Sequence, residues 1–175
     1  MVFLPRWRNP FPMEKALRVG ELEVIYPPGA VRPGLKCLWL SRRHKPLPAQ
    51  LQALAKYGVG TVAVVLKLFK SFDEVLDLVD AYKPQVVVAV IKCDWILKLA
   101  RARKQVEVLI PVFKTVYRGL EPPETWNENV DWLEPVWEIK RRKGKKVAER
   151  VYYVRRFTGF VSLKPATERT VLSSC

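Results

Sequence analysis

The sequence predicts an α/β protein: a Rossmann-like three-layer domain with a mainly parallel sheet, followed by a C-terminal antiparallel β-hairpin. Three observations favour this fold class. Between residues 35 and 118, apolar runs of strand length alternate with helical segments, as in βαβ units. A cation follows each run, close to the point where a strand is expected to end. After residue 131 the helical periodicity gives way to two alternating runs around a glycine turn.

The strands of the parallel set are rich in apolar and β-branched residues, as expected of strands covered on both faces. They are expected at Lys36–Leu40, Thr61–Leu66, Val86–Ile91 and Val106–Phe113. The first intervening helix begins at Pro48, because proline suits the first helical turn, and Gly58 ends it. The sequence Ser71-Phe72-Asp73-Glu74 is a capping box that begins the second helix. Asp94 is expected to cap a third helix from Trp95 to Ala102.

The segments on either side of this core have different compositions. A proline-rich, aromatic N-terminal stretch and a strand at Gly20–Tyr26 are expected to pack on the core. Val136–Arg142 and Val147–Arg156 form the hairpin, and Phe160–Leu163 is a short strand after it. The expected divisions are an arm and strand at 1–34, the core at 35–118, a linker at 119–131, the hairpin extension at 132–163 and a tail at 164–175.

The composition restricts the classes of function. The formal net charge of +14 favours an anionic partner such as a nucleotide or a nucleic acid. Three cysteines without C-x-x-C spacing and a single histidine give no zinc site, so neither a metal nor a cofactor is expected. No apolar run approaches the length of a membrane span, so we expect no membrane partner and a cytoplasmic location. Scarce Asn and Gln with abundant charged residues hint at a thermophilic source.

The cations after the strands predict a phosphate-binding cleft. Carboxyl ends of parallel strands form the ligand crevice of open α/β sheets, and a helix N-terminus nearby favours anions. The expected ligand-binding residues are Arg42, Arg43, Lys67, Lys70, Ser71 and Lys114. The alternative is that each of these side chains simply points into water. No G-x-G-x-x-G or Walker A motif is present, so a dinucleotide cofactor or P-loop chemistry is not indicated.

The segment Leu38 to Gln50, which reads LWLSRRHKPLPAQ, resembles the opening of small CRISPR-associated Rossmann-like (CARF-type) proteins. In that family a hydrophobic strand ends in Ser and His before the first helix, and the strand ends bind cyclic oligoadenylate. Some members cleave it as metal-independent ring nucleases. The resemblance covers residues 35 to about 113, with an extra residue around Arg42–Arg43. It implies that Ser41 and His44 lie against the ligand and that Lys67 and Lys92 meet its phosphates.

Under this enzyme hypothesis the catalytic residues are Ser41, His44 and Lys92. A ribose 2′-OH would attack its own phosphodiester, with cations stabilising the charge that builds on phosphate oxygens. A histidine titrates near neutrality and is suited to general acid–base chemistry, although a lone loop histidine is more often a solvated or capping residue.

The hairpin supports a second hypothesis, a non-enzymatic DNA- or RNA-binding protein of viral or plasmid type. Its cations are interleaved with Trp137, Tyr152, Tyr153 and Phe157, a pattern typical of surfaces that bind RNA or single strands. The expected nucleic-acid contacts are Arg141, Lys143, Lys145, Lys146, Arg155 and Arg156. The alternative is a solvated hairpin whose aromatic side chains pack on the domain. A third hypothesis is an interaction module that forms a homodimer through the N-terminal arm and the hairpin.

Overall fold

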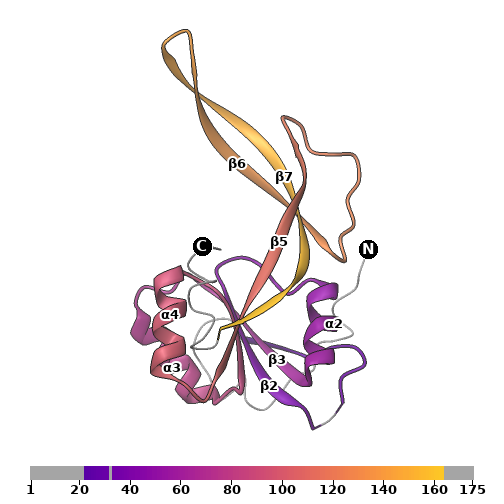
Figure 1. Ribbon diagram of the computed structural model, residues 1–175, viewed down its shortest axis with the longest axis vertical. Helices are drawn as coiled ribbons and strands as arrows, with labels where there is room; N and C mark the ends of the chain where they lie inside the picture. Colours follow the sequence, from indigo (N-terminus) through magenta and orange to yellow (C-terminus); the bar gives the residue numbers. More distant parts are fainter. Residues whose placement is uncertain (1–21, 32, 164–175) are drawn as a thin grey trace.

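One mixed sheet organises the protein in the computed structural model, which describes residues 22–31 and 33–163. Its seven strands lie in the order β1-β3-β2-β4-β5-β7-β6. Figure 1 shows β5, β6 and β7 rising from the part of the sheet that contains β2 and β3. The strands are β1 (Leu22–Ile25), β2 (Leu35–Ser41), β3 (Val59–Leu66), β4 (Val86–Val90), β5 (Glu107–Gly119), β6 (Asp131–Arg142) and β7 (Lys145–Leu163). The helices are α2 (Pro48–Tyr57), α3 (Phe72–Tyr82) and α4 (Cys93–Ala102).

The predicted fold class, a Rossmann-like three-layer domain with a mainly parallel sheet, is wrong. Strands account for 48% of the described residues and helices for 22%, and the sheet is mostly antiparallel. Only the pairings of β2 with β3, β2 with β4 and β4 with β5 are parallel. The longest ladders, β5 with β7 and β6 with β7, are antiparallel, as is β1 with β3. The error arose because the C-terminal strands join the same sheet instead of forming an appendage.

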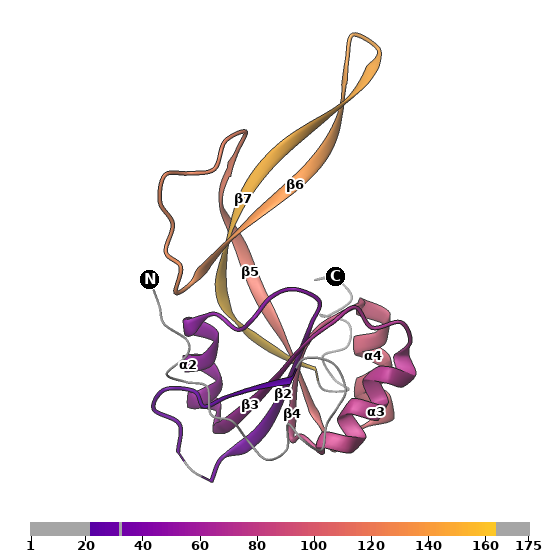
Figure 2. The ribbon, with the colours of Figure 1, turned by 180° about the vertical axis from the view of Figure 1, so that it is seen from behind.

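The body of the protein is built around β2, the strand that both β3 and β4 flank. Side chains alternate between its two faces. Leu38 and Leu40 pack toward α3 and α4, whereas Cys37 and Trp39 pack toward α2. All four are at most 1% exposed. Figures 1 and 2 show the helices on opposite sides of the sheet. Coverage on both faces explains why these strands are almost wholly apolar.

The helix boundaries follow local signals, with one correction. Ser71 caps α3 as predicted: its Oγ accepts the N–H of Glu74 at 3.4 Å. The start of α4 was predicted two residues too late. That helix begins at Cys93 after Lys92, so Asp94 lies in the first turn, where its charge favours the helix dipole, and is not the cap.

Two strands leave the body and continue into a long arm. β5 and β7 stay paired from Val108 with Leu163 to Gly119 with Tyr152, and β6 pairs along the other edge of β7 (Figure 2). The sequence predicted separate strands before and after Thr158-Gly159. β7 instead runs through this point with a register shift, and the φ of +151° at Gly159 favours glycine.

Beyond Tyr152 the arm has only two strands. This tip, named the ribbon here, comprises Val136–Arg142 of β6, Lys145–Val151 of β7 and the turn between them. Seven residue pairs at about 3.4 Å each make it roughly 24 Å long. The turn consists of Lys143 (φ 52°) and Gly144 (φ 77°), the two positive φ values that a type I′ hairpin turn requires.

Two predictions fall on residues that are not described. The packing of the N-terminal arm concerns residues 1–21, and the frayed tail concerns residues 164–175, so both lie outside the described residues. Among the residues that the structure does describe, no helix has the length and apolar character needed to cross a membrane.

Replacing Gly60 with alanine is expected to destabilise the body, because the strand starts of β2 and β3 meet there. A Cβ at Gly60 would lie 2.8 Å from both N and Cα of Gly34, and backbone atoms cannot move aside like a side chain. We expect Gly60→Ala to lower the free energy of unfolding by about 1–3 kcal/mol in urea denaturation. Gln52→Ala, on the exposed side of α2, is the control. Equal urea midpoints for the two variants would contradict this close approach.

Candidate nucleic-acid interface

The strand-end loops of the body meet at one edge of the sheet, as the sequence suggested. Ser41, at the end of β2, pairs with Leu66 of β3 on one side and with Val90 of β4 on the other. The N–H of Lys67 donates to the Ser41 carbonyl at 3.1 Å, so the loops after β2 and β3 touch. Lys114 is the exception. It was expected at a strand end but lies inside β5, within the arm.

One cation at this edge, Lys67, is neutralised by a carboxylate, whereas Lys92 contacts an aromatic ring. Lys67 forms an ion pair with Glu74 at 3.5 Å, and the Lys92 ammonium lies 4.8 Å from the centre of the Trp95 ring. Arg42, Arg43 and Lys70 are exposed and form no ion pair with another residue in the described part of the chain. Lys92 is also exposed and has no carboxylate partner in the described part of the chain, so four cations remain at this edge for an anion.

Ser41 and His44 make contacts that stabilise their own loop. Ser41 is 1% exposed, and its Oγ accepts the N–H of His44 at 3.1 Å. The imidazole of His44 stacks on Trp132 at the base of the arm, with ring centres 3.7 Å apart. Burial lowers the pKa of His44, and the nearby Arg43 lowers it further, so the ring is neutral at pH 7. The geometry gives both side chains a structural role at the junction of body and arm.

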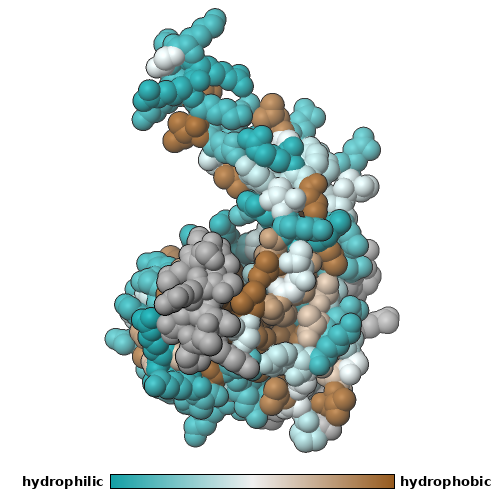
Figure 3. Space-filling view, in the orientation of Figure 1, coloured by the Kyte–Doolittle hydropathy of each residue, from teal (hydrophilic) through white to brown (hydrophobic). Residues whose placement is uncertain are grey.

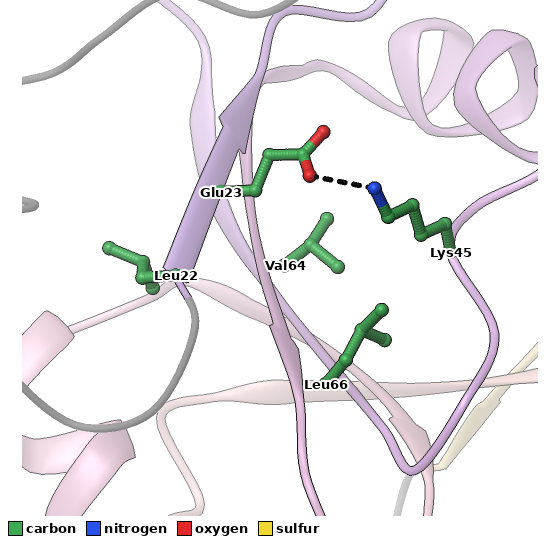
Figure 4. A pocket seen from close by; sticks show the side chains of 5 residues that line it. All are labelled: Leu22, Glu23, Lys45, Val64 and Leu66. Carbon is green, nitrogen blue, oxygen red and sulfur yellow. Dashed lines mark hydrogen bonds and ion pairs between the residues drawn. The ribbon is translucent and has the colours of Figure 1, made fainter.

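A pocket beside this loop is too small for a nucleotide. It has a volume of about 150 Å³ and is lined by Leu22, Glu23, Lys45, Val64 and Leu66. Sites for small-molecule ligands typically have about 300–1,000 Å³. The Glu23 carboxylate and the Lys45 ammonium form an ion pair across it at 3.1 Å (Figure 4). This pair neutralises the charge that an anionic ligand would need.

An ion pair between a buried carboxylate and a partly exposed arginine anchors the base of the arm. The Asp131 carboxylate, 1% exposed, accepts two hydrogen bonds from Arg156, at 2.8 and 3.0 Å. The guanidinium holds the pKa of Asp131 below its usual value, and the N–H of Asn127 also donates to this carboxylate. Arg155 is similarly engaged, since it donates to Glu134 at 2.9 Å and to Thr115. Two arginines expected to contact nucleic acid are thus bound within the protein.

Farther along, one face of the arm carries a network of ion pairs. Cross-strand partners share a face, and successive pairs alternate between faces. Glu138 accepts from Arg118 of β5 at 2.6 Å and from the Tyr153 hydroxyl. Glu149 pairs with Lys140 at 3.0 Å and with Arg142 at 3.3 Å. These two carboxylates pair with Arg118, Lys140 and Arg142 on this side, which we name the ion-pair face. Lys145, opposite Arg142, lies on the same side and pairs with no described carboxylate.

The opposite side of the ribbon, the open face, combines exposed apolar groups with cations. It consists of the side chains of Trp137, Ile139, Arg141, Lys146, Ala148 and Arg150. Trp137 is 66% exposed and Ile139 is 72% exposed. The guanidinium of Arg150 lies 5.9 Å from the ring of Trp137 and 5.5 Å from that of Tyr152, just below the ribbon. Figure 3 shows hydrophobic residues scattered among hydrophilic ones along the arm.

Four cations surround the turn at the far end of the ribbon. Arg141, Lys143, Lys145 and Lys146 are all exposed, and no described carboxylate pairs with them. These four residues are the tip cations. All of them were predicted from the sequence as nucleic-acid contacts, and the turn brings them together because Arg141 and Lys146 are cross-strand partners.

The sequence analysis did not foresee the glutamates that divide the arm into two faces. Glu134 and Glu138 occur four residues apart in β6, a spacing that places them on the same face as Glu149 of β7. The spacing of the two glutamates could be seen in the sequence. Which cations they meet could be known only from the pairing register of β5, β6 and β7. Within residues 22–31 and 33–163, no cluster of three or more His, Cys, Asp or Glu side chains is placed to hold a metal ion.

Asp131→Asn is expected to weaken the anchor of the arm. The neutral amide loses the charge-assisted hydrogen bonds to Arg156, so we expect the free energy of unfolding at pH 7 to fall by about 1–3 kcal/mol. Because the pKa of Asp131 is lowered in the folded state, the wild-type advantage should disappear as pH falls below about 4. Urea denaturation at several pH values tests this. Glu128→Gln, at an exposed loop position, should change little at any pH.

His44→Phe should remove one pH dependence of stability while keeping the stack on Trp132. The pKa of His44 is lowered in the folded protein, so the unfolded chain binds the proton more tightly. Wild-type stability should therefore fall relative to the variant as pH decreases below about 6.5. This is the only histidine, so the comparison of urea midpoints from pH 8 to pH 5 is direct. Parallel pH profiles would show that the imidazole is not perturbed by folding.

Comparison of the chain with protein-family models, curated proteins and solved structures found no match. No relative therefore assigns a role to any of these residues, and the CARF-type resemblance stays a prediction.

Proposed function

We propose that the protein binds nucleic acid through the tip of its arm and acts as a binding protein without catalysis. The observation that carries this proposal is the group of four tip cations. They stand on a projecting two-stranded ribbon, and no described carboxylate neutralises them. Cations that repel one another at close range, far from the core, favour a polyanion as their partner.

The dimensions of the ribbon suit this partner. A two-stranded ribbon alone is only marginally stable in water. This one is supported by β5 at its base and by the ion pairs of one face, and such support favours a ribbon that acts as a binding surface. At roughly 24 Å the ribbon is long enough to follow several phosphates, or to enter a major groove about 12 Å wide. The net charge of +14 adds long-range attraction to the same class of ligand.

The alternative is a nucleotide-phosphate ligand at the strand ends of the body, including a cyclic oligoadenylate. Arg42, Arg43 and Lys70 favour it, because they are exposed and unpaired within the described chain. The buried Ser41 hydroxyl and the stacked His44 give no support to chemistry at this edge, so ligand binding without turnover is the form of the alternative that the geometry supports.

A fourfold variant with glutamine at Arg141, Lys143, Lys145 and Lys146 should lose most nucleic-acid affinity. Each phosphate contact contributes to the salt dependence of binding, so the slope of log K against log salt should shrink by up to about 3 for single strands. We expect at least a tenfold weaker binding at moderate salt, measured by fluorescence anisotropy with short RNA, single-stranded DNA and duplex DNA. The matched control places glutamine at Arg42, Arg43, Lys70 and Lys92, which removes the same charge from exposed sites at the strand ends of the body.

The two variants separate the two candidate functions. If the tip variant binds polynucleotides like the wild type, the proposal is wrong. If the control variant alone loses binding, and a cyclic tetra- or hexa-adenylate is the preferred ligand, function belongs to the strand ends of the body. A mass measurement by size exclusion with light scattering tests the homodimer hypothesis on the same samples.

A further inference from the structure

The two faces of the ribbon differ in charge, although the residues of both faces alternate along the same two strands. On the ion-pair face, Glu138 and Glu149 lie opposite each other and receive Arg118, Lys140 and Arg142. On the open face, the three cross-strand pairs are Trp137 with Arg150, Ile139 with Ala148, and Arg141 with Lys146. None of these residues is acidic. The acidic residues of the ribbon are therefore confined to one side.

The open face also exposes large apolar side chains, which are unfavourable in water unless a partner covers them. Trp137 leaves two thirds of its surface in water, and Ile139 leaves more. Fully burying a large apolar side chain typically gains about 1.5–3 kcal/mol, so a partner that covers these two side chains would be favoured. Arg150 packs over the rings of Trp137 and Tyr152, which places a positive charge between two aromatic groups.

We propose that the open face of the ribbon binds a single-stranded nucleic acid, with a base stacked on Trp137 and phosphates held by Arg141, Lys146 and Arg150. This proposal rests on the proposed function and specifies its ligand and its surface. An exposed tryptophan beside unpaired cations matches a single strand, whose bases are free to stack. In a duplex the bases are already stacked, so phosphate contacts alone would be made and the exposed indole would contribute little.

Charge complementarity decides among the possible occupants. A second copy of this chain would bring another set of tip cations toward the first, and a net charge of +14 opposes that approach. A single strand supplies both the anionic groups and the flat apolar surfaces that the open face requires. The ion-pair face meets these needs less well, because all of its cations except Lys145 already have carboxylate partners.

Two double variants test the assignment of the face. Arg141→Gln with Lys146→Gln removes two charges from the open face, and Lys140→Gln with Arg142→Gln removes two from the ion-pair face at neighbouring positions. The probes are a labelled 12-nucleotide RNA, the same sequence as single-stranded DNA, and a 12-base-pair duplex. We expect the open-face variant to reduce the salt slope for single strands by about 1.4 and to bind at least tenfold more weakly at moderate salt. The ion-pair-face variant should change affinity less than threefold.

Trp137→Ala tests the stacking, with Trp137→Phe as the conservative control. Loss of one stacked base should weaken single-strand binding by about 5- to 100-fold and leave the salt slope unchanged, since no charge is removed. Phenylalanine should restore most of the affinity. Duplex binding should change less than twofold. Because Trp137 is exposed, circular dichroism and the melting temperature should match the wild type.

Three results would overturn this inference. Equal losses from the two double variants would remove the distinction between the faces while leaving nucleic-acid binding by the tip in place. Preference for duplex with no effect of Trp137→Ala would leave a phosphate-binding arm and exclude stacking. If Trp137→Ala converts a dimer to a monomer and leaves single-strand binding unchanged, the open face is an interface between copies of the chain. Failure of the proposed function is a separate result, recognised by wild-type binding in the fourfold tip variant.

Discussion

The pairing of β7 with β5 is the constraint on which the rest of the structure depends. β7 is 19 residues long, and its last residues pair with the part of β5 that lies in the body. Its first residues form the ribbon with β6. One strand therefore transmits the rigidity of the core to a projection that would otherwise be a marginally stable hairpin. A third strand to Gly119 and the ion pair of Arg156 with the buried Asp131 carboxylate hold the arm in one direction relative to the body.

The contacts divide the candidate functional residues into two groups: those that stabilise the junction of body and arm, and those that stay exposed at the tip. Arg155, Arg156, Ser41 and His44 serve the junction of body and arm through ion pairs, a turn hydrogen bond and the stack on Trp132. The tip cations and Arg150 remain exposed without carboxylate partners among the described residues. At the base of the arm, Glu134 and Asp131 lie within reach of Arg155 and Arg156, whereas no described carboxylate reaches the tip cations, which water solvates.

A two-stranded ribbon that binds a partner needs both internal stabilisation and an interaction surface. In this protein the ion-pair face stabilises the ribbon and the open face is the proposed interaction surface. The glutamates of the ion-pair face hold the cations of β5 and β6 in place, although exposed ion pairs contribute little individually. Because the ion pairs lie on one face, the open face can expose Trp137, Ile139 and the unpaired cations. Alternation of side chains in a strand makes this separation achievable within a single hairpin.

The sequence by itself determined the local elements: the three helices, the parallel strands of the body, the Ser71 cap, the glycine turn at the tip and the basic character of the arm. Each of these depends on neighbouring residues, through periodicity, capping or turn geometry. The tertiary structure alone decided that β5 and β7 are one continuous ladder, which made the sheet mostly antiparallel and placed Lys114 within the arm. It also decided which cations are neutralised, because Arg118 meets Glu138 and Arg156 meets Asp131 only through register between distant segments.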